Sequence, residues 1–390
     1  MWFHRGALGA AIVLTIGALG IYLSASRDAP VGDMAGSVSR PVDARAPGSR
    51  PNLLPAFAPV PRPAPNVYAA ITNGVVSPAV ANLPARVYVP DSNANTLDVI
   101  DPASFRVVAR YYVGAIPHHV TPAWDLHELY VDDEGGSSLG VIEPATGQVT
   151  RSIPVPYPYN LYFTPDGRLA IVVVERLSRL DFRDPKTWQL IKSVYIPWRG
   201  VDHLDFSADG SYLLASTEWS GMVVKIDLSK LEIVGTINVG GLPIDVRLSP
   251  DGSVFYVTNQ GRHGVSVVDG ARLEEIAFLP TGRGAHGLQV SHDARFMYVS
   301  NRDAGSISVI DLGLRQLVAT WNIGGSPDML QLSPDGRQLW ATGRYSGSVY
   351  VVSTETGGLL ATIPVGAGAH GLTYFPNVGL HSLGHNGVYR

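Results

Sequence analysis

The sequence predicts an all-β fold, a seven-bladed β-propeller, from three observations. A short sequence motif, made of a small loop, an apolar pair and a turn, recurs along the chain. Its copies are spaced by 41, 43, 42, 42, 42 and 42 positions at the apolar residues Val120, Leu161, Leu204, Val246, Leu288, Leu330 and Leu372. This period accommodates four short strands, which is typical of a propeller blade. The first and last repeats are also incomplete in complementary ways, which indicates that the ring closes on itself.

Each full repeat reads as four strands, called a to d from the channel outward. In one repeat they fall at residues 286–291, 295–300, 306–311 and 316–323. The turn from a to b is Ser-Pro-Asp-Gly at residues 249–252 and again at 333–336. Proline presets φ, aspartate bonds back to the backbone and glycine accepts positive φ, so this phrase predicts a tight hairpin.

Ring closure follows from the two ends of the repeat region, residues 86–375. The first repeat starts at strand b, with strands expected at 86–90, 96–100 and 106–113. The last repeat supplies only a strand a, at 370–375. The C-terminal strand is therefore predicted to complete the N-terminal blade and to leave no open sheet edge. Residues 376–390 form a short tail that carries His381 and His385.

The N-terminal region predicts export. His4 and Arg5 precede an apolar run at residues 6–25, long enough to span a bilayer, and small residues at 24–26 suit signal cleavage. Residues 1–26 are thus a signal peptide or a membrane anchor. Residues 27–66 are a Pro/Ala-rich linker and residues 67–85 an N-terminal arm. Either interpretation predicts an extracytoplasmic protein, secreted or anchored to the outer side of the cytoplasmic membrane.

Composition excludes several classes of function. The chain has no cysteine, which excludes disulfides, thiolate metal sites, iron–sulfur clusters and covalently attached haem. A net charge of −4 with only 16% charged residues argues against a nucleic-acid partner. The motifs of hydrolase elbows, phosphate loops and dinucleotide sites are not found in the sequence.

Two expected b strands carry a recognisable motif. Tyr-Val-Thr-Asn at 256–259 and Tyr-Val-Ser-Asn at 298–301 resemble the motif of the YVTN family of seven-bladed propellers, over about residues 86–375. The terminal segments Phe-Pro-Asn-Val-Gly at 375–379 and Gly-His-Asn-Gly-Val-Tyr-Arg at 384–390 also make the whole chain resemble exported actinobacterial propellers of unassigned function. The resemblance implies the fold, and it leaves binding, surface-layer, lactonase-like and cytochrome-d1-like roles open.

The candidate site lies on one face of the ring, because the d–a and b–c loops of a propeller emerge together around the channel mouth. Imidazoles and carboxylates are concentrated at the positions two residues and one residue before the apolar anchors. When the repeats are aligned, these positions form two columns, the earlier and the later. The candidate ligands for zinc or copper are His118, His286, His370, Asp202 and Asp328. The candidate ligand-binding face comprises His119, His203, Glu175, Glu218, Asn259, Arg302 and Arg344. Strand alternation predicts that only one column faces the channel.

The same imidazoles have a simpler interpretation, in which they bond neighbouring backbone and join the blades. Asp205 and Arg247 are likewise expected to form an ion pair between blades.

Three functions remain open at this point, of which the first is favoured. It is a non-catalytic binding scaffold for a cell-envelope protein or a small ligand, with no nucleic-acid partner and with an N-terminal membrane tether as one option. The second is a metal-dependent hydrolase or lactonase-like enzyme with a His/Asp site at the channel mouth. The third is a structural envelope protein.

Overall fold

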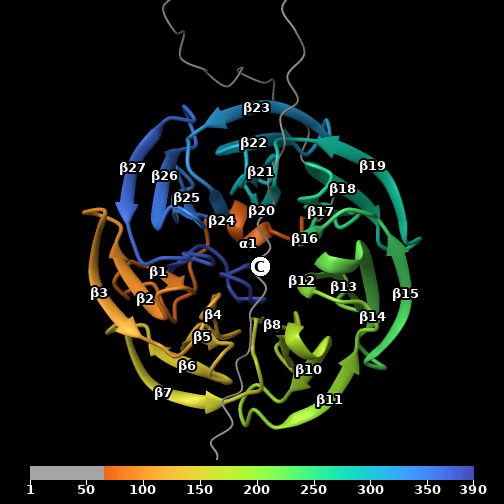
Figure 1. Cartoon of the computed structure of the whole chain (residues 1–390), viewed down its shortest axis with the longest axis horizontal. Coiled ribbons are helices and arrows are strands. Elements are labelled where there is room, and N and C mark those ends of the chain that lie inside the picture. The colour runs from red at the N-terminus through yellow and green to blue at the C-terminus, as the bar shows by residue number, and fades with distance from the viewer. Residues whose placement is uncertain (1–65) are drawn as a thin grey trace, which may run out of the picture. The chain divides into compact units, whose positions relative to one another are not determined.

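Seven four-stranded antiparallel sheets surround a central channel in the computed structural model, which describes residues 66–390 (Figure 1). This confirms the predicted seven-bladed propeller. The expected signal or anchor (1–26) and nearly all of the expected linker lie outside the described residues. Within the described residues, none of the helices has the length and hydropathy needed to cross a membrane.

The strands follow the predicted order from the channel outward. The innermost, a strands are β28 (Thr373–Phe375), β4 (Val120–Pro122), β8 (Asn160–Phe163), β12 (Val201–Phe206), β16 (Pro243–Leu248), β20 (Ala285–Val290) and β24 (Pro327–Leu332). The b strands are β1 (Arg86–Asp91), β5 (Leu129–Asp133), β9 (Ala170–Val174), β13 (Tyr212–Thr217), β17 (Phe255–Asn259), β21 (Phe296–Asn301) and β25 (Gln338–Gly343). The c strands are β2 (Thr96–Asp101), β6 (Ser138–Glu143), β10 (Arg179–Arg183), β14 (Met222–Asp227), β18 (Gly264–Asp269), β22 (Ser306–Asp311) and β26 (Ser348–Ser353). The outermost, d strands are β3 (Arg106–Tyr112), β7 (Gln148–Pro154), β11 (Leu190–Tyr195), β15 (Glu232–Asn238), β19 (Glu274–Pro280), β23 (Gln316–Asn322) and β27 (Leu359–Pro364).

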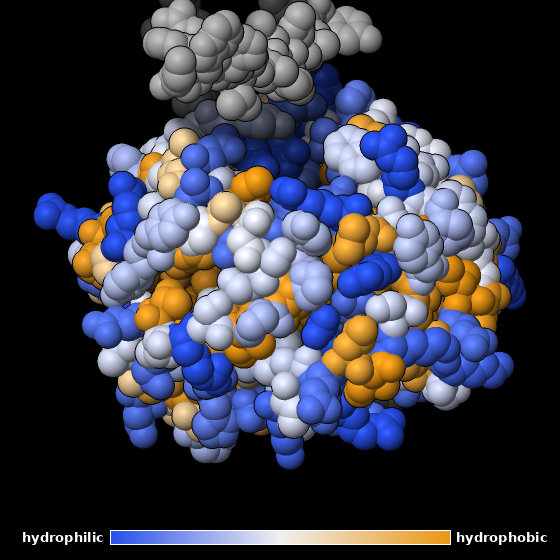
Figure 2. All heavy atoms as spheres, turned by 60° about the horizontal axis from the view of Figure 1, so that its bottom comes forward, coloured by the Kyte–Doolittle hydropathy of each residue, from blue (hydrophilic) through white to orange (hydrophobic). Residues whose placement is uncertain are grey.

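The ring closes as the sequence predicted. Strand β28 pairs antiparallel with β1, with Val87 opposite Tyr374, so the two ends of the repeat region share one sheet. The hydrophobic core lies between neighbouring blades, where inner strands are buried on both faces. The d strands form the outer edge, and Figure 2 shows hydrophobic side chains scattered there among hydrophilic ones. Leu190, Ile191 and Tyr195 of β11 are examples of exposed apolar side chains on this edge.

A β-bulge interrupts the inner strand of four blades near the channel mouth. In β20, Ala285 pairs with Asn301 and Leu288 pairs with Val299. The pairing therefore advances by three residues on β20 but by only two residues on β21, which leaves one extra residue on β20. The same shift occurs in β12, β16 and β24. A bulge bends the strand and changes the direction in which the side chain of the extra residue points.

A hydroxyl group from the b strand holds each of these bulges. The backbone N–H of Asp245 donates to Oγ1 of Thr258 (2.8 Å), and that hydroxyl donates to the carbonyl of His286 in the next blade (2.5 Å). Ser216, Ser300 and Thr342 make equivalent pairs of contacts. The Thr and Ser of the Tyr-Val-Thr/Ser-Asn motif therefore fix the loop of their own blade to the adjacent blade.

The arm and the tail cover the opposite face of the ring. The arm contains α1 (Ala69–Thr72), and its Tyr68 hydroxyl donates to the carbonyl of Leu248 (2.9 Å). The guanidinium of Arg390 lies 5.6 Å from the Tyr68 ring centre. Figure 1 shows the C terminus over the middle of the ring, close to α1. Both ends of the described chain therefore meet where the channel would otherwise open.

Candidate metal centre in the propeller channel

Both columns of polar residues reach the interior of the channel. The His119 and His370 rings are 4.7 Å apart between centres, and the His118 and His370 rings are 5.3 Å apart. His119 and His118 belong to different columns. The prediction that only one column faces the channel is therefore wrong, because bulges and preceding loop backbone break the strict alternation of an extended strand.

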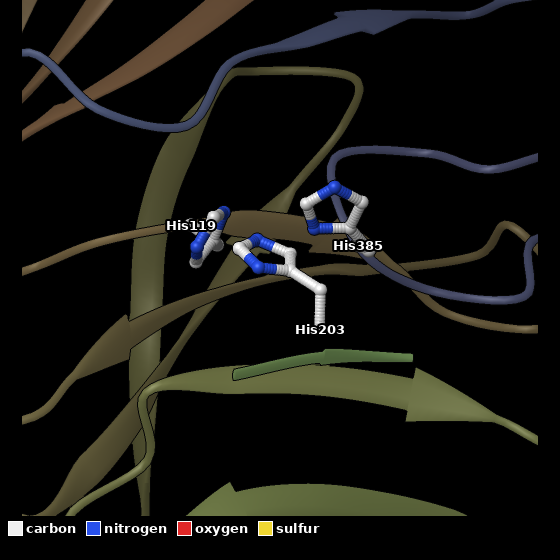
Figure 3. Close-up of side chains that lie close together, drawn as sticks. All are labelled: His119, His203 and His385. Carbon is white, nitrogen blue, oxygen red and sulfur yellow. The ribbon is translucent and has the colours of Figure 1, made fainter. Parts of the chain in front are cut away.

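Among the described residues, three imidazoles form a group of potential metal ligands, and Figure 3 shows their rings converging. His119, His203 and His385 each offer one ring nitrogen, and the three nitrogens lie within 4.8 Å of one another. Their residues are 1%, 0% and 3% exposed. In a tetrahedral zinc site with bonds of 2.0–2.1 Å, the ligand nitrogens are about 3.4 Å apart. Binding of an ion would therefore shorten the distances between these nitrogens by about an ångström.

Two of these histidines come from the ring of blades. His119 directly precedes β4, and His203 lies in the bulge of β12. Its backbone N–H donates to Oγ of Ser216 (3.2 Å), which fixes the position of the bulge. Both residues belong to the later of the two sequence columns, which had been assigned to a ligand-binding face.

The third histidine comes from the tail, which enters the channel as a tight hairpin at residues 383–388. The N–H of Leu383 donates to the carbonyl of Val388 (2.7 Å), and the N–H of His385 donates to the carbonyl of Leu161 (2.9 Å). His385 and Asn386 occupy the tip with φ of 39° and 54°. Such left-handed backbone is uncommon outside glycine and often marks a functional constraint. The hairpin therefore retains two strained residues whose side chains point into the channel.

Polar groups orient each of the three rings. Nδ1 of His119 donates to Oδ1 of Asn386 (3.0 Å), which leaves its Nε2 without a hydrogen-bond partner among residues 66–390. Nδ1 of His203 lies 2.8 Å from Oδ1 of Asp202 in an ionic contact, and its Nε2 is also unpartnered. For His385, Nε2 lies 3.5 Å from Oδ1 of Asp245 and Nδ1 lies 3.0 Å from the Asn160 amide nitrogen. His119 and His203 therefore have the usual form of a metal ligand, an imidazole held through one nitrogen with the other free, whereas both nitrogens of His385 have polar neighbours.

The five residues predicted as metal ligands surround this group. Asp202 stands behind His203, and Asp328 accepts from Nδ1 of His370 (2.7 Å). Nε2 of His370 has no hydrogen-bond partner within the region that the structure describes.

The rings of His118 and His286 are engaged elsewhere. His118 donates from Nε2 to Glu134 (3.0 Å), and Arg176 contacts the same carboxylate (2.6 Å). His286 lies between the Arg302 guanidinium, which donates to its Nε2, and the Asp328 carboxylate. These two rings contribute to ion-pair networks at the channel mouth.

The other residues of the predicted ligand-binding face lie around the mouth. Glu175 begins the short helix η1 (Glu175–Leu177) and accepts from the Trp219 indole (2.9 Å). Glu218 begins η2 (Glu218–Ser220). Arg344 donates to the carbonyl of Gly368 (3.0 Å). Asn259 has a structural role, since it donates to the carbonyl of Gly240 (2.8 Å) and holds the d–a loop.

Electrostatics keep two of the three site imidazoles neutral. Burial lowers the pKa of His385 to about 4, and burial with the neighbouring His370 holds the pKa of His119 well below its usual value. For His203, burial opposes protonation but the Asp202 carboxylate outweighs it and raises the pKa.

The two carboxylates behind the site stay ionised. Despite burial, His203 lowers the pKa of Asp202, and Arg247 followed by His385 lowers the pKa of Asp245. The centre therefore has imidazole donors backed by two anions, which suits a divalent cation.

Sequence reasoning missed His385 as a member of the site. The tail was recognised, but no spacing connects His385 with His119 or His203. The expected Asp205–Arg247 ion pair is also wrong. Asp205 pairs with Arg390 of the tail (2.8 Å) and Arg247 with Asp245 (3.4 Å), so the tail takes the place expected for a neighbouring blade.

Comparison with solved structures shows the fold. A hydrazine synthase chain from Kuenenia stuttgartiensis matches with a TM-score of 0.60 and 21% identity, covering 71% of this chain and 97% of that one. A functionally unknown protein from Desulfotomaculum acetoxidans DSM 771 matches with a TM-score of 0.65 and 14% identity, covering 74% and 98%. The dihydro-heme d1 dehydrogenase NirN matches with a TM-score of 0.59 and 15% identity, covering 76% and 75%.

A search of curated protein sequences found no match. The family model for YNCE-like beta-propellers matches residues 52–377, a span that contains all twenty-eight strands of the described region. The YVTN-type resemblance of the b strands is consistent with that family. The chain therefore belongs to the YNCE-like β-propeller family.

Proposed function

We propose that this chain is an exported, non-catalytic binding propeller whose ligand is a divalent transition-metal ion held by His119, His203 and His385. The observation that carries the proposal is the convergence of three buried imidazoles, two of which have an unpartnered Nε2. A buried polar atom without a partner costs free energy, and a bound ion would remove that cost.

The chemistry of the donors narrows the ion to zinc or copper. Imidazole suits zinc, copper, iron and nickel, and copper binds most tightly of these divalent ions at simple nitrogen sites. Zinc has no geometric preference from d-electrons and is commonly held by three histidines. Asp202 and Asp245 place two negative charges directly behind the donors, which balances a dication. This combination supports Zn²⁺ or Cu²⁺.

Binding fits the centre better than hydrolysis does. A catalytic zinc needs an open coordination position that a substrate can reach. The three ligands are between 0% and 3% exposed, and the tail lies across one end of the channel. A lactonase-like role would require both the ion and space for the substrate beside it.

Metal analysis tests the proposal. The full-length protein is purified without an affinity tag or chelator, equilibrated with Zn²⁺ or Cu²⁺, desalted and analysed by inductively coupled plasma mass spectrometry. We expect about one ion per chain, and at least a tenfold lower content in His203→Ala and His119→Ala. His118→Ala is the matched control and should keep its ion, because its ring already bonds Glu134. No bound ion, or full content in His203→Ala, would overturn the proposal.

The enzyme alternative has its own test. The zinc-loaded protein should hydrolyse activated esters and lactones no faster than the His203→Ala variant does. Turnover that requires both zinc and His203 would favour a metal-dependent hydrolase instead.

Export rests on the apolar run at residues 6–25 and on the Pro-rich stretch that follows it. Cell fractionation with N-terminal sequencing of the mature protein tests it. Recovery outside the cytoplasm is expected, with an N-terminus near residue 26 if the run is a signal and an intact N-terminus if it is an anchor. Recovery in the cytoplasmic fraction would contradict export.

A further inference from the structure

The tail that closes one face of the channel also supplies a ligand to the candidate metal centre. We propose that the C-terminal tail, residues 376–390, is a metal-dependent closure: ion binding fastens its hairpin in the channel, and release of the hairpin opens the path by which the ion enters and leaves. This inference rests on the proposed metal-binding function and adds a mechanism that regulates ion entry and release.

The tail contacts several blades and, apart from an isolated bridge between Gly384 and Tyr162 of β8, lies outside their sheets. The N–H of Phe163 donates to the carbonyl of Leu383 (3.0 Å), and Nε2 of Gln331 donates to the carbonyl of Gly387 (3.2 Å). The His381 ring stacks on Trp124 with centres 4.0 Å apart. Because β28 ends at Phe375, release of the tail would break no strand pairing within the blades, but it would expose Leu383 and Tyr389, which pack in two of the hydrophobic clusters.

Docking of the tail leaves several polar atoms without partners. Four buried polar atoms of the tail have no hydrogen-bond partner in the described part of the chain: Nδ1 of His381, Nδ2 of Asn386, the Tyr389 hydroxyl oxygen and Nε of Arg390. Each such atom loses water without a replacement, which weakens docking. Two left-handed residues at the hairpin tip add backbone strain. The docked tail therefore carries costs that a coordination bond to His385 would offset.

The ligands divide between the two parts that would separate. His119 and His203 stay with the blades, whereas His385 travels with the tail and Asn386, which orients His119, travels with it. Undocking thus removes one ligand and the orienting partner of a second in a single movement. Docking of the tail and binding of the ion are consequently linked, so each favours the other.

The opposite end of the channel is held differently. There the Arg302 guanidinium contacts Asp328 and His286, and Asp328 also accepts from His370. All four residues lie on the ring of blades, and opening this network would separate a buried charge pair. The tail is not a strand of any blade, although its release also breaks the largely buried Arg390–Asp205 ion pair.

Linkage sets the size of the expected effect. An ion that binds only the docked state raises the docking equilibrium constant by a factor of 1 + [ion]/Kd, about 100-fold at 100 times Kd. Amide exchange in the hairpin should slow by up to that factor. Exchange in the loops of the opposite face should change little.

Hydrogen exchange measured by mass spectrometry tests the closure on the full-length protein, with and without Zn²⁺. Peptides covering residues 376–390 and 160–164 report tail docking, since the N–H of Phe163 bonds the tail. Peptides covering residues 283–288 and 300–304 report the mouth. At least tenfold slowing confined to the tail reporters, and absent in His203→Ala, supports the closure. Equal slowing in both sets, or none in a protein that binds zinc, overturns it.

A second variant separates the closure from the site. Arg390→Ala removes the Asp205 contact but none of the three imidazoles. It should bind one ion yet release it to a chelator about ten times faster than the unaltered chain does, whereas the exposed Arg168→Ala control should not. An unchanged release rate in Arg390→Ala contradicts the closure, while failure of every variant and of the unaltered chain to bind zinc contradicts the proposed function itself.

Discussion

Nδ1 of His119 lies 3.0 Å from Oδ1 of Asn386, although the two residues are 267 positions apart in the chain. His119 directly precedes the inner strand β4, and Asn386 lies at the tip of the tail hairpin. Their contact fixes the tautomer of His119 and leaves its Nε2 without a hydrogen-bond partner among the described residues. It joins the tail to the candidate metal centre without itself providing a ligand.

Replacing Asn386 should separate ion affinity from hairpin stability. Asn386→Gly suits the left-handed backbone of the tip but removes the acceptor that orients His119. We expect zinc affinity to fall about 10- to 100-fold, the usual effect of losing such an orienting partner. Competition with a chromophoric chelator measures it, and Asn386→Asp, which keeps an acceptor, should restore most of the affinity. Unchanged affinity in Asn386→Gly would mean that the contact does not orient a ligand.

The Asp328 network should contribute mainly to stability. Asp328 is buried between Arg302, His286 and His370, and these groups hold its pKa well below its usual value. Asp328→Ala leaves the Arg302 charge buried and unpaired, so the free energy of unfolding should drop by about 3–5 kcal/mol. Urea denaturation measures it. Asp335→Ala, in an exposed a–b turn, should lose about 1 kcal/mol, and equal losses in the two variants would contradict this role.

The hydroxyl groups that hold the bulges should be individually measurable. Thr258→Val keeps the side-chain shape but removes both the acceptor for Asp245 N–H and the donor to the His286 carbonyl. The expected loss in unfolding free energy is about 2 kcal/mol. Thr258→Ser retains the hydroxyl and should lose less than half as much. Chemical denaturation of the two variants in parallel decides this, and a larger loss in the serine variant would refute it.

Glu218 should make stability fall at alkaline pH. Burial first, then repulsion by Asp202, raises its pKa from 4.5 to about 8, and Glu175 and Asp328 add to the effect while Arg302 opposes it. Since the folded state holds the proton more tightly, the stabilising contribution is complete below about pH 4.5 and is lost as pH rises through about 8.

Glu218→Gln removes this dependence. The variant should gain stability relative to the unaltered chain at pH 9, on the order of 1 kcal/mol after screening, and little at pH 5. Thermal unfolding at the two pH values measures the difference. A gain of equal size at both would show that the effect is not one of proton binding.

The sequence by itself determined the ring. Apolar anchors about 42 residues apart, Ser-Pro-Asp-Gly turns and the incomplete first and last repeats encode local strand geometry and pairing order, which depend on nearby residues. From these, the seven blades and closure by the last strand could be predicted, and both are present.

Only the tertiary structure decided which imidazoles meet. Strand alternation indicated one inward column, but the bulges in β12, β16, β20 and β24 depend on hydroxyl contacts with the next blade, which form only when the blades are assembled. Whether a ring nitrogen is free depends on distant partners such as Arg302 for His286 and Asn386 for His119. His385 joins the centre because the tail folds back into a channel that exists only once all seven blades are assembled.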